Sequence, residues 1–243
     1  MNVMTCPNEG LSYLLSKYQV AAEGEARLVK GKNALLIGEK EYALLPWRYE
    51  RRMVELKNLL NDGTLKDPCV LRTTLITHKD ECLRRMIKRE FDIAEFLFDS
   101  KIVAVYAVMA DDKLANMVTK LDCGVVVNYE LAATLAEGAQ IMDKHEIIAS
   151  VGVALDKVVD TQINQNSIYV YGETDKTPEG YTDVDFELFG LTIDQIAKVR
   201  CAFAALKSPE LLDEMARQDE RLNRLVALAY ESAETGKKLI VEG

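Results

Sequence analysis

Hydrophobic positions along this chain recur with the period of a helix in some stretches and with the period of a strand in others. Helical spacing predicts helices over about 49–60, 79–98, 192–206 and 209–235. Between the second and third helix the period shortens to two, which is typical of strands. The strands expected there cover the ranges 101–109, 114–121, 125–132, 146–151, 158–163 and 167–171, and a further strand, rich in β-branched residues, is expected before the second helix over 69–78.

The order of these elements indicates the fold class. Runs of strands followed by helices, rather than strict alternation, predict an α+β fold with an open, mostly antiparallel sheet and helices packed on one face. The turns at Asp111-Asp112 and Asp122-Cys123-Gly124 predict antiparallel hairpins. The first 32 residues carry a helix that Pro7 opens and then an ambiguous stretch. We therefore expect residues 1–32 to be a helical or irregular segment and residues 33–243 to be the sheet domain.

Composition excludes several classes of function. Hydrophobic residues make up 49% of the 243 residues, which allows a substantial core. The net charge of −9 repels phosphate backbones and argues against nucleic-acid binding. No apolar run reaches the ~20 residues of a membrane helix, and no secretory signal pattern opens the chain. The five cysteines form no CxxC pair, so we expect free thiols and a cytoplasmic protein.

Motifs for cofactor or metal binding are missing from the sequence. The thirteen glycines never fall in a GxGxxG pattern, and there is no Gly-x-Ser-x-Gly elbow. The two histidines are His78 and His145. A metal site built from these two with Asp80 and Glu146 is conceivable, but metal-ligand spacing is lacking. We therefore expect ordinary strand-end histidines, with no metal and no cofactor.

Several segments resemble the C-terminal domain of the glucose–fructose oxidoreductase / inositol dehydrogenase (Gfo/Idh/MocA) family. The most specific is the closing segment 230–237, YESAETGK, which is similar to the family's "iyeSaetGk". The segment 91–98 with 101–107 is similar to "HdiDllrwL…vvsVya", and Cys123–Val127 is similar to "nGvva". The resemblance covers about residues 42–241. It implies the α+β fold predicted above.

The departures from the family pattern concern the chemistry. Family members open with a Rossmann domain, which this sequence does not contain. The family lysine lies in a Glu-Lys-Pro motif, whereas the similar string here is Glu39-Lys40-Glu41. At the places of the family's proton-transfer Asp and His this chain has Ile87 and Phe91, which cannot move a proton. We expect this part of the former active site to be plain packed helix.

A second interpretation is that the chain has kept a binding site for a sugar or a carboxylate. Its substrate-binding candidates are Arg48, Tyr49, Arg51 and Arg72, whose guanidinium and aromatic groups suit hydroxyls and carboxylates. His78 is the weak candidate for proton transfer. The alternative for the residues near Trp47 is an amphipathic helix start with solvated arginines. The strand 69–78 separates Arg72 from His78 by six residues, about 20 Å.

Two functions follow as hypotheses. The first is a non-catalytic relative of these oxidoreductases that acts as an oligomeric assembly, regulatory or small-ligand-binding subunit. The alternative is a subunit of a split oxidoreductase, or a cofactor-independent enzyme, acting on a sugar or sugar acid. Apolar strand residues exceed what two or three helices can bury. The resemblance implies that the uncovered face of the sheet pairs with another subunit, so we expect a homo-oligomer joined through the sheet. A Rossmann-containing partner protein and a sugar-like ligand are the other expected partners.

Overall fold

The computed structural model describes residues 3–21, 24–156, 169–171 and 185–241, with the backbone alone for 169–171. Within these residues the chain forms two compact units. Unit 1 comprises residues 1–54 and 183–221, and unit 2 comprises residues 55–182 and 222–243. The domain boundary expected near Asn33 falls inside unit 1. The strand β2, which begins at Ala34, pairs with β1 on one side and with β3 on the other, so the chain is continuous in one small sheet across this position.

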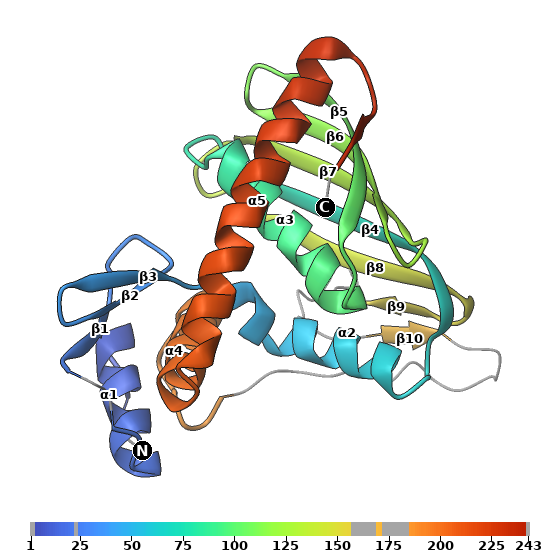
Figure 1. The fold of residues 1–243 in the computed structure, drawn as a ribbon. Helices are drawn as coiled ribbons and strands as arrows, with labels where there is room; N and C mark the ends of the chain where they lie inside the picture. Colours follow the sequence, from blue (N-terminus) through green and yellow to red (C-terminus); the bar gives the residue numbers. More distant parts are fainter. Residues whose placement is uncertain (1–2, 22–23, 157–168, 172–184, 242–243) are drawn as a thin grey trace. The chain divides into compact units, whose positions relative to one another are not determined.

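Unit 1 combines helices with a small antiparallel sheet of order β1-β2-β3 (Figure 1). Its elements are α1 (Pro7–Tyr18), β1 (Ala26–Leu28), β2 (Ala34–Ile37), β3 (Lys40–Ala43), the 3-10 turn η1 (Pro46–Tyr49) and α4 (Ile193–Lys207). Helices α2 (Arg51–Asn61) and α5 (Glu210–Thr235) contribute residues to both units. Both α1 and η1 pack on α4, and Leu14, Leu45 and Val199 are fully buried in this core.

Unit 2 is built on an eight-stranded sheet of order β10-β9-β8-β4-β7-β6-β5-β11. Its strands are β4 (Lys66–His78), β5 (Ile102–Ala110), β6 (Leu114–Leu121), β7 (Val126–Leu135), β8 (Met142–Val151), β9 (Val153–Leu155), β10 (Tyr169–Tyr171) and β11 (Leu239–Ile240). Among the strands that the structure describes, only β4 and β7 pair in parallel, and the other pairs are antiparallel. The predicted α+β class and mostly antiparallel sheet are confirmed.

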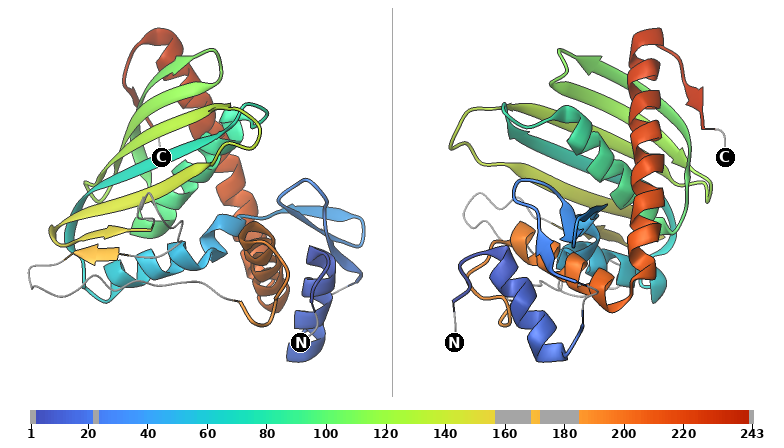
Figure 2. Two further views of the ribbon diagram at one scale, coloured as in Figure 1. Left: turned by 180° about the vertical axis from the view of Figure 1, so that it is seen from behind. Right: turned by 60° about the vertical axis from the view of Figure 1, so that its left-hand side comes forward.

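Helix α3 (Leu83–Phe98) covers one face of this sheet, where it packs against β7, β4 and β6. The C-terminal part of α5 lies on the same face (Figure 2, right). Strict alternation of buried and exposed residues in β6 shows that only this face is covered in the described residues. The helices therefore lie on one side, as the pattern predicts.

The closing segment that resembles the oxidoreductase family has a structural explanation. The Ser232 hydroxyl on α5 accepts the Ala107 N–H of β5 at 3.0 Å and donates to the Lys237 carbonyl at 2.6 Å. Gly236 ends the helix with a φ of +65°, a conformation that favours glycine. Serine and glycine at these places let the chain turn back so that β11 can pair with β5.

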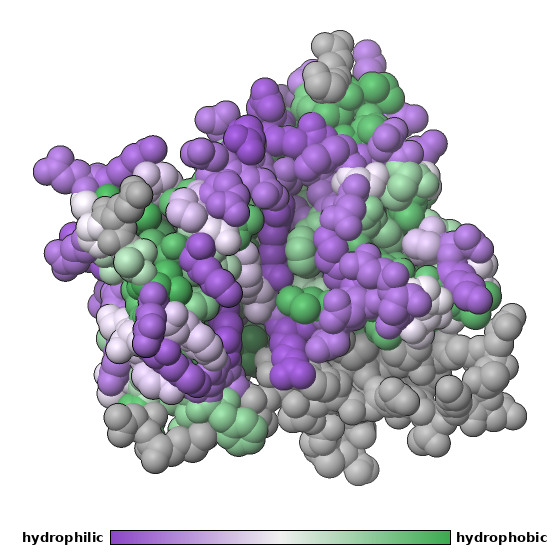
Figure 3. Space-filling view, turned by 60° about the horizontal axis from the view of Figure 1, so that its bottom comes forward, coloured by the Kyte–Doolittle hydropathy of each residue, from purple (hydrophilic) through white to green (hydrophobic). Residues whose placement is uncertain are grey.

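Two of the expected elements cannot be compared with the structure over their full length. The strand expected over 158–163 and most of the loop expected over 174–185 lie outside the described residues. None of the described helices is long and apolar enough to cross a membrane. Hydrophilic side chains predominate on the described surface seen in Figure 3, with smaller hydrophobic patches between them.

Candidate functional site

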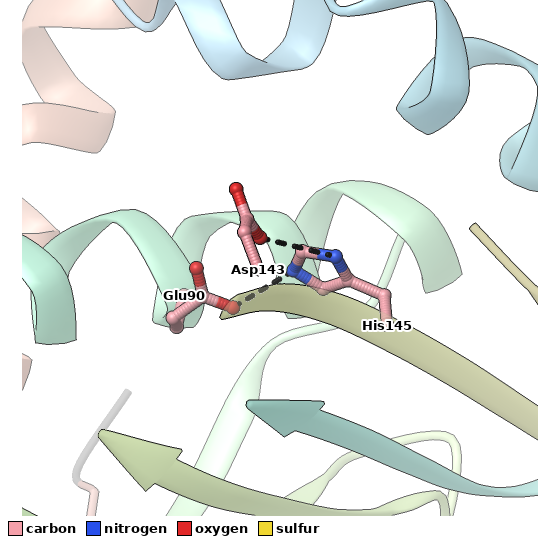
Figure 4. Close-up of side chains that lie close together, drawn as sticks. All are labelled: Glu90, Asp143 and His145. Atoms are coloured by element: carbon pink, nitrogen blue, oxygen red, sulfur yellow. Dashed lines mark hydrogen bonds and ion pairs between the residues drawn. The ribbon is translucent and has the colours of Figure 1, made fainter. Parts of the chain in front are cut away.

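A buried network of charged side chains links α3 to the β8–β9 side of the sheet in unit 2. At its centre is His145 of β8, whose side chain is 1% exposed. The His145 ring lies between two carboxylates, with Nε2 2.9 Å from Glu90 Oε2 and Nδ1 2.6 Å from Asp156 Oδ2. Figure 4 shows Glu90, His145 and the neighbouring Asp143 side chain directed towards one another.

The alternation of β8 explains how these side chains meet. Asp143, His145 and Ile147 occupy alternate positions of this strand, so they share the face that α3 covers. Glu90 reaches the same place from α3, where it is fully buried. Charged residues at such positions are rarely buried unless they are paired.

Asp156 fixes the orientation of the imidazole. It follows β9 directly, and its backbone N–H donates to the His145 carbonyl at 3.1 Å. Its Oδ1 accepts the backbone N–H of His145 at 2.6 Å, while Oδ2 faces the ring Nδ1. Three hydrogen bonds between two residues leave the ring little freedom to rotate.

Arg89 extends the network towards solvent. Its guanidinium pairs with Glu90, and its Nη2 lies 2.9 Å from Asp143 Oδ2. The side chains of Arg89 and Asp143 are 15% and 23% exposed, in contrast to the buried His145 and Glu90. The charges therefore run from the interior of unit 2 to its surface.

The surroundings fix the charge state of the central pair. Burial lowers the pKa of His145, but Asp156 and Glu90 outweigh this effect and raise the pKa to about 10. Burial alone would raise the pKa of Glu90, yet Arg89 and then His145 lower it below its ordinary value. At neutral pH His145 is therefore an imidazolium that donates from both nitrogens to the carboxylates of Asp156 and Glu90.

Three of these residues also have the donor types of a metal site. Oxygen or nitrogen atoms of Glu90, Asp143 and His145 lie within 4.8 Å of one another. A metal ion on His145, however, needs a ring nitrogen that carries no proton, and both nitrogens face carboxylates at hydrogen-bond distance. Arg89 already supplies a cation between Glu90 and Asp143. The geometry fits an ion-pair network better than a metal centre.

This interpretation gives a prediction for added metal ions. We expect Zn²⁺ or Mn²⁺ at a tenfold excess to change the midpoint of thermal unfolding by less than about 1 °C, because binding would require loss of the His145 proton and of the Arg89 contacts. Differential scanning calorimetry with and without metal, at pH 7, measures this shift. Stabilisation by several degrees that disappears in a His145→Gln variant would contradict the interpretation.

The sheet beside His145 carries further polar side chains. Thr73 of β4 pairs with His145 in register, and its hydroxyl finds no hydrogen-bond partner among the described residues. On the other side of Thr73, Tyr129 of β7 shares a 2.9 Å hydrogen bond with the Thr119 hydroxyl. The Tyr129 ring also packs edge-on against Phe91 at 5.2 Å. Polar groups are thus concentrated beneath α3, where apolar packing is the usual arrangement.

The candidates expected around Trp47 all belong to unit 1. Arg48 lies 3.9 Å from Glu214, and Arg51 is exposed at the start of α2. Burial, followed by the nearby Cys201, raises the pKa of Tyr49 to about 12, so its phenol stays neutral. Trp47 is 8% exposed, which leaves its ring unavailable as a sugar platform.

The candidates on β4 belong to unit 2. Arg72 lies on the exposed face of the strand and pairs with Glu146 at 3.1 Å. His78 ends the strand, half-buried, with Nε2 2.8 Å from the Ala139 carbonyl oxygen. Each has its own local partner, so the two do not form a common pocket.

The positions matched to the family's proton-transfer pair are plain core. Ile87 and Phe91 are both fully buried in α3, as expected. The helix begins at Leu83, after a turn at Lys79–Glu81, rather than at residue 79. No acid or base replaces the pair at these two positions.

The network around His145 was not found from the sequence, and the expectation of a strand-end His145 is wrong. The strand was expected to begin at Glu146, whereas β8 begins at Met142, so His145 lies inside it. The conceivable metal set with His78, Asp80 and Glu146 is not assembled, because His145 and Glu146 lie on opposite faces of β8. The available signal was the alternation of Asp143, His145 and Ile147.

Comparison with known proteins shows similarity in structure alone. No family model matches the sequence, and no curated protein does. A levoglucosan dehydrogenase in complex with NADH and L-sorbose matches with a TM-score of 0.64 at 14% identity, over 83% of this chain and 66% of that one. An inositol dehydrogenase homolog from Azotobacter vinelandii, complexed with NADH and myo-inositol, matches with a TM-score of 0.62 at 10% identity, over 82% and 64%.

An oxidoreductase from Agrobacterium radiobacter, in complex with NAD+, L-tartaric acid and magnesium, also matches. Its TM-score is 0.62 at 14% identity, over 82% of this chain and 64% of that one. This chain therefore spans less than two thirds of these structures. At such identities the likeness establishes the fold, which is shared with sugar oxidoreductases, and nothing finer.

Proposed function

We propose that this chain is a non-catalytic relative of the sugar oxidoreductases that acts as an oligomeric assembly, regulatory or small-ligand-binding subunit. The observation that carries the proposal is the burial of Ile87 and Phe91 in α3. The resemblance to the oxidoreductase family places its proton-transfer residues at these positions. A hydride-transferring dehydrogenase of this kind needs an acid or base beside the reacting hydroxyl, and these side chains supply neither.

The buried charged residues around His145 in unit 2 support the same proposal. His145 is enclosed by Glu90 and Asp156 and is 1% exposed, so a substrate hydroxyl cannot reach either ring nitrogen in this arrangement. General acid–base catalysis requires a proton donor or acceptor within hydrogen-bond reach of the substrate. The network therefore serves the fold of unit 2 in this proposal.

A nucleotide titration tests this proposal. We expect the protein to bind NAD(H) and NADP(H) more weakly than about 100 µM, or roughly 5.5 kcal/mol, in isothermal titration calorimetry. We also expect no NAD(P)+ reduction above a protein-free control, at 340 nm, with hexoses, inositols and sugar acids as substrates.

Either tight nucleotide binding or turnover would favour the alternative, in which the chain acts on a sugar or sugar acid. A Rossmann-containing partner protein could then supply the cofactor, so the assay is repeated with any protein that copurifies. His78→Ala and Arg72→Ala are the variants for that case. Unchanged turnover in both would remove these two residues from the mechanism.

A further inference from the structure

The segment 185–191 of unit 1, here called the aromatic turn, carries the most exposed of the large apolar side chains that the structure describes. Phe186 is 70% exposed, and Phe189 is 46% exposed. Three residues span at most about 11 Å of chain, so both rings belong to one small surface. Val3, 58% exposed, lies against the next residue, because a Cβ at Gly190 would meet its Cγ1 at 2.7 Å. Neighbouring exposed apolar side chains, unlike scattered single ones, indicate an interaction site.

Polar contacts hold the aromatic turn in one conformation. The Asp185 carboxylate accepts two backbone N–H groups of the turn, at 3.0 and 3.1 Å, and a 2.7 Å hydrogen bond from Arg200 of α4. The Glu187 carboxylate accepts from Arg200 at 2.9 Å and from the Tyr18 hydroxyl of α1 at 2.6 Å. It also pairs with Lys17 of α1. The turn is therefore fixed to two helices of unit 1 before any partner binds.

Leucines, and not the phenylalanines, pack the aromatic turn onto unit 1. Leu188 is fully buried, and an added Cβ at Gly10 of α1 would meet Leu188 and Leu191 at 3.1 Å each. The Met4 N–H donates to the Phe189 carbonyl at 2.8 Å, which ties the turn to the start of the chain (Figure 1). The exposed rings of Phe186 and Phe189 therefore contribute little to the packing of unit 1.

The charge around the aromatic turn distinguishes between possible partners. The described charged residues of the turn, of its hydrogen-bond partners and of the first turns of α1 and α4 comprise four carboxylates and two cations, a net charge of −2; they are Glu9, Asp185, Glu187, Asp194, Lys17 and Arg200. A second copy of the turn would bring the same negative charge against it, and an anionic membrane surface would repel it. A protein surface with Lys or Arg beside an apolar pocket is complementary to both the rings and the charge.

We propose that the aromatic turn docks into another protein, which receives Phe186 and Phe189 in an apolar pocket bordered by Lys or Arg side chains. Aromatic residues at the centre of an interface carry much of the binding energy, and a turn that is already ordered loses little entropy on binding.

The exposed area fits an interface of ordinary size. The two rings together expose roughly 230 Å², if a whole phenylalanine side chain counts as about 200 Å². This is about half of the roughly 450 Å² of apolar area in a standard interface of ~800 Å² per partner. Val3 and Ile193, which is 41% exposed, supply part of the rest. The proposal concerns association alone, so its outcome is separate from that of the nucleotide titration.

Photo-crosslinking followed by affinity measurements tests this proposal. The photoreactive residue p-benzoylphenylalanine replaces Phe186 in the full chain, expressed in its native cells. The same replacement of Tyr106 on β5, which is 40% exposed, is the control. A protein that crosslinks to position 186 and not to position 106 is purified, and its Kd for the wild-type chain is measured by isothermal titration calorimetry.

The affinities of variants then decide whether the aromatic turn is the site of contact. We expect Phe186→Ser and Phe189→Ser each to raise the Kd at least ~30-fold, and Tyr106→Ser to raise it less than ~3-fold. Raising NaCl from about 50 to about 500 mM should raise the wild-type Kd at least ~5-fold, because opposite charges meet around the pocket. Circular dichroism checks that each variant keeps its native fold, as the exposure of these side chains predicts.

The proposal is overturned if no protein crosslinks specifically to position 186, or if the captured protein binds both serine variants as tightly as the wild type. A Kd that does not change with salt would contradict the basic border of the pocket. Two further measurements examine other occupants, namely cosedimentation with phosphatidylcholine vesicles, with and without phosphatidylserine, and analytical ultracentrifugation of the protein alone. Vesicle binding or self-association that Phe186→Ser abolishes would assign the turn to a membrane or to a second copy, and would also overturn the proposal.

Discussion

Replacing His145 by leucine is expected to lower the free energy of unfolding by about 3–5 kcal/mol. The imidazolium lies between Glu90 and Asp156, which are 0% and 1% exposed. Leucine fills much of the same volume but removes the positive charge and both donors. The two buried carboxylates then lose the positive charge that they share. The free-energy cost of removing them from water is therefore no longer offset for either of them.

Urea unfolding of wild type and variant at pH 7 measures this difference. His78→Leu is the matched control, because His78 is half-buried and makes one contact to a backbone carbonyl. The His78→Leu substitution should lower the free energy of unfolding by less than about 1.5 kcal/mol, which is the net contribution of a typical hydrogen bond. Equal effects of the two substitutions would show that the carboxylates of Glu90 and Asp156 relax or take up protons without significant cost.

A double-mutant cycle with Glu90→Gln separates the pair from its surroundings. Glu90→Gln removes one carboxylate but keeps the shape of the side chain and a contact to Arg89. If His145 and Glu90 stabilise each other directly, their substitutions should be non-additive by about 1–3 kcal/mol. Additive effects would assign the stabilisation by His145 to Asp156 alone.

The strands and helices of this chain were largely predictable because their patterns are local. The alternation over Leu114–Leu121 depends only on neighbouring residues, and β6 has these bounds. The helical spacing that predicts a helix over about 192–206 is likewise local, and α4 covers Ile193–Lys207. The pairing of β4 with β7 in parallel was not predictable in this way, since it joins segments about 55 residues apart along the chain.

The buried network around His145 could not be predicted from the sequence, for a related physical reason. The run Asp143-Lys144-His145-Glu146 is polar throughout, so its two faces cannot be told apart without the covering helix. Only tertiary structure brings Glu90 and Asp156 to the same ring. The ion pairs between His145 and these two carboxylates offset the free-energy cost of burying the charges. Polar residues can therefore lie inside this strand, although they usually mark the end of one.

Raising the pH is expected to destabilise the wild-type protein more than the His145→Leu variant. The native state holds a proton on His145 up to about pH 10, whereas the unfolded chain releases it near 6.5. A group with a raised native pKa contributes its full stabilisation below its unfolded pKa and loses it as the pH rises towards the native value. Between these values the free energy of unfolding should fall by up to about 1.4 kcal/mol per pH unit.

Urea unfolding at pH 6.5, 8 and 9 therefore should show the difference between wild type and His145→Leu becoming smaller, by up to roughly 3 kcal/mol at pH 9. Taking the difference removes the titration of groups that both proteins share. Measurements stop at pH 9 because this is close to the native pKa of His145, about 10, above which little of its contribution remains. A difference that stays constant from pH 6.5 to 9 would mean that the native wild-type protein holds no more protons than the variant over this range, and it would contradict the raised pKa of His145.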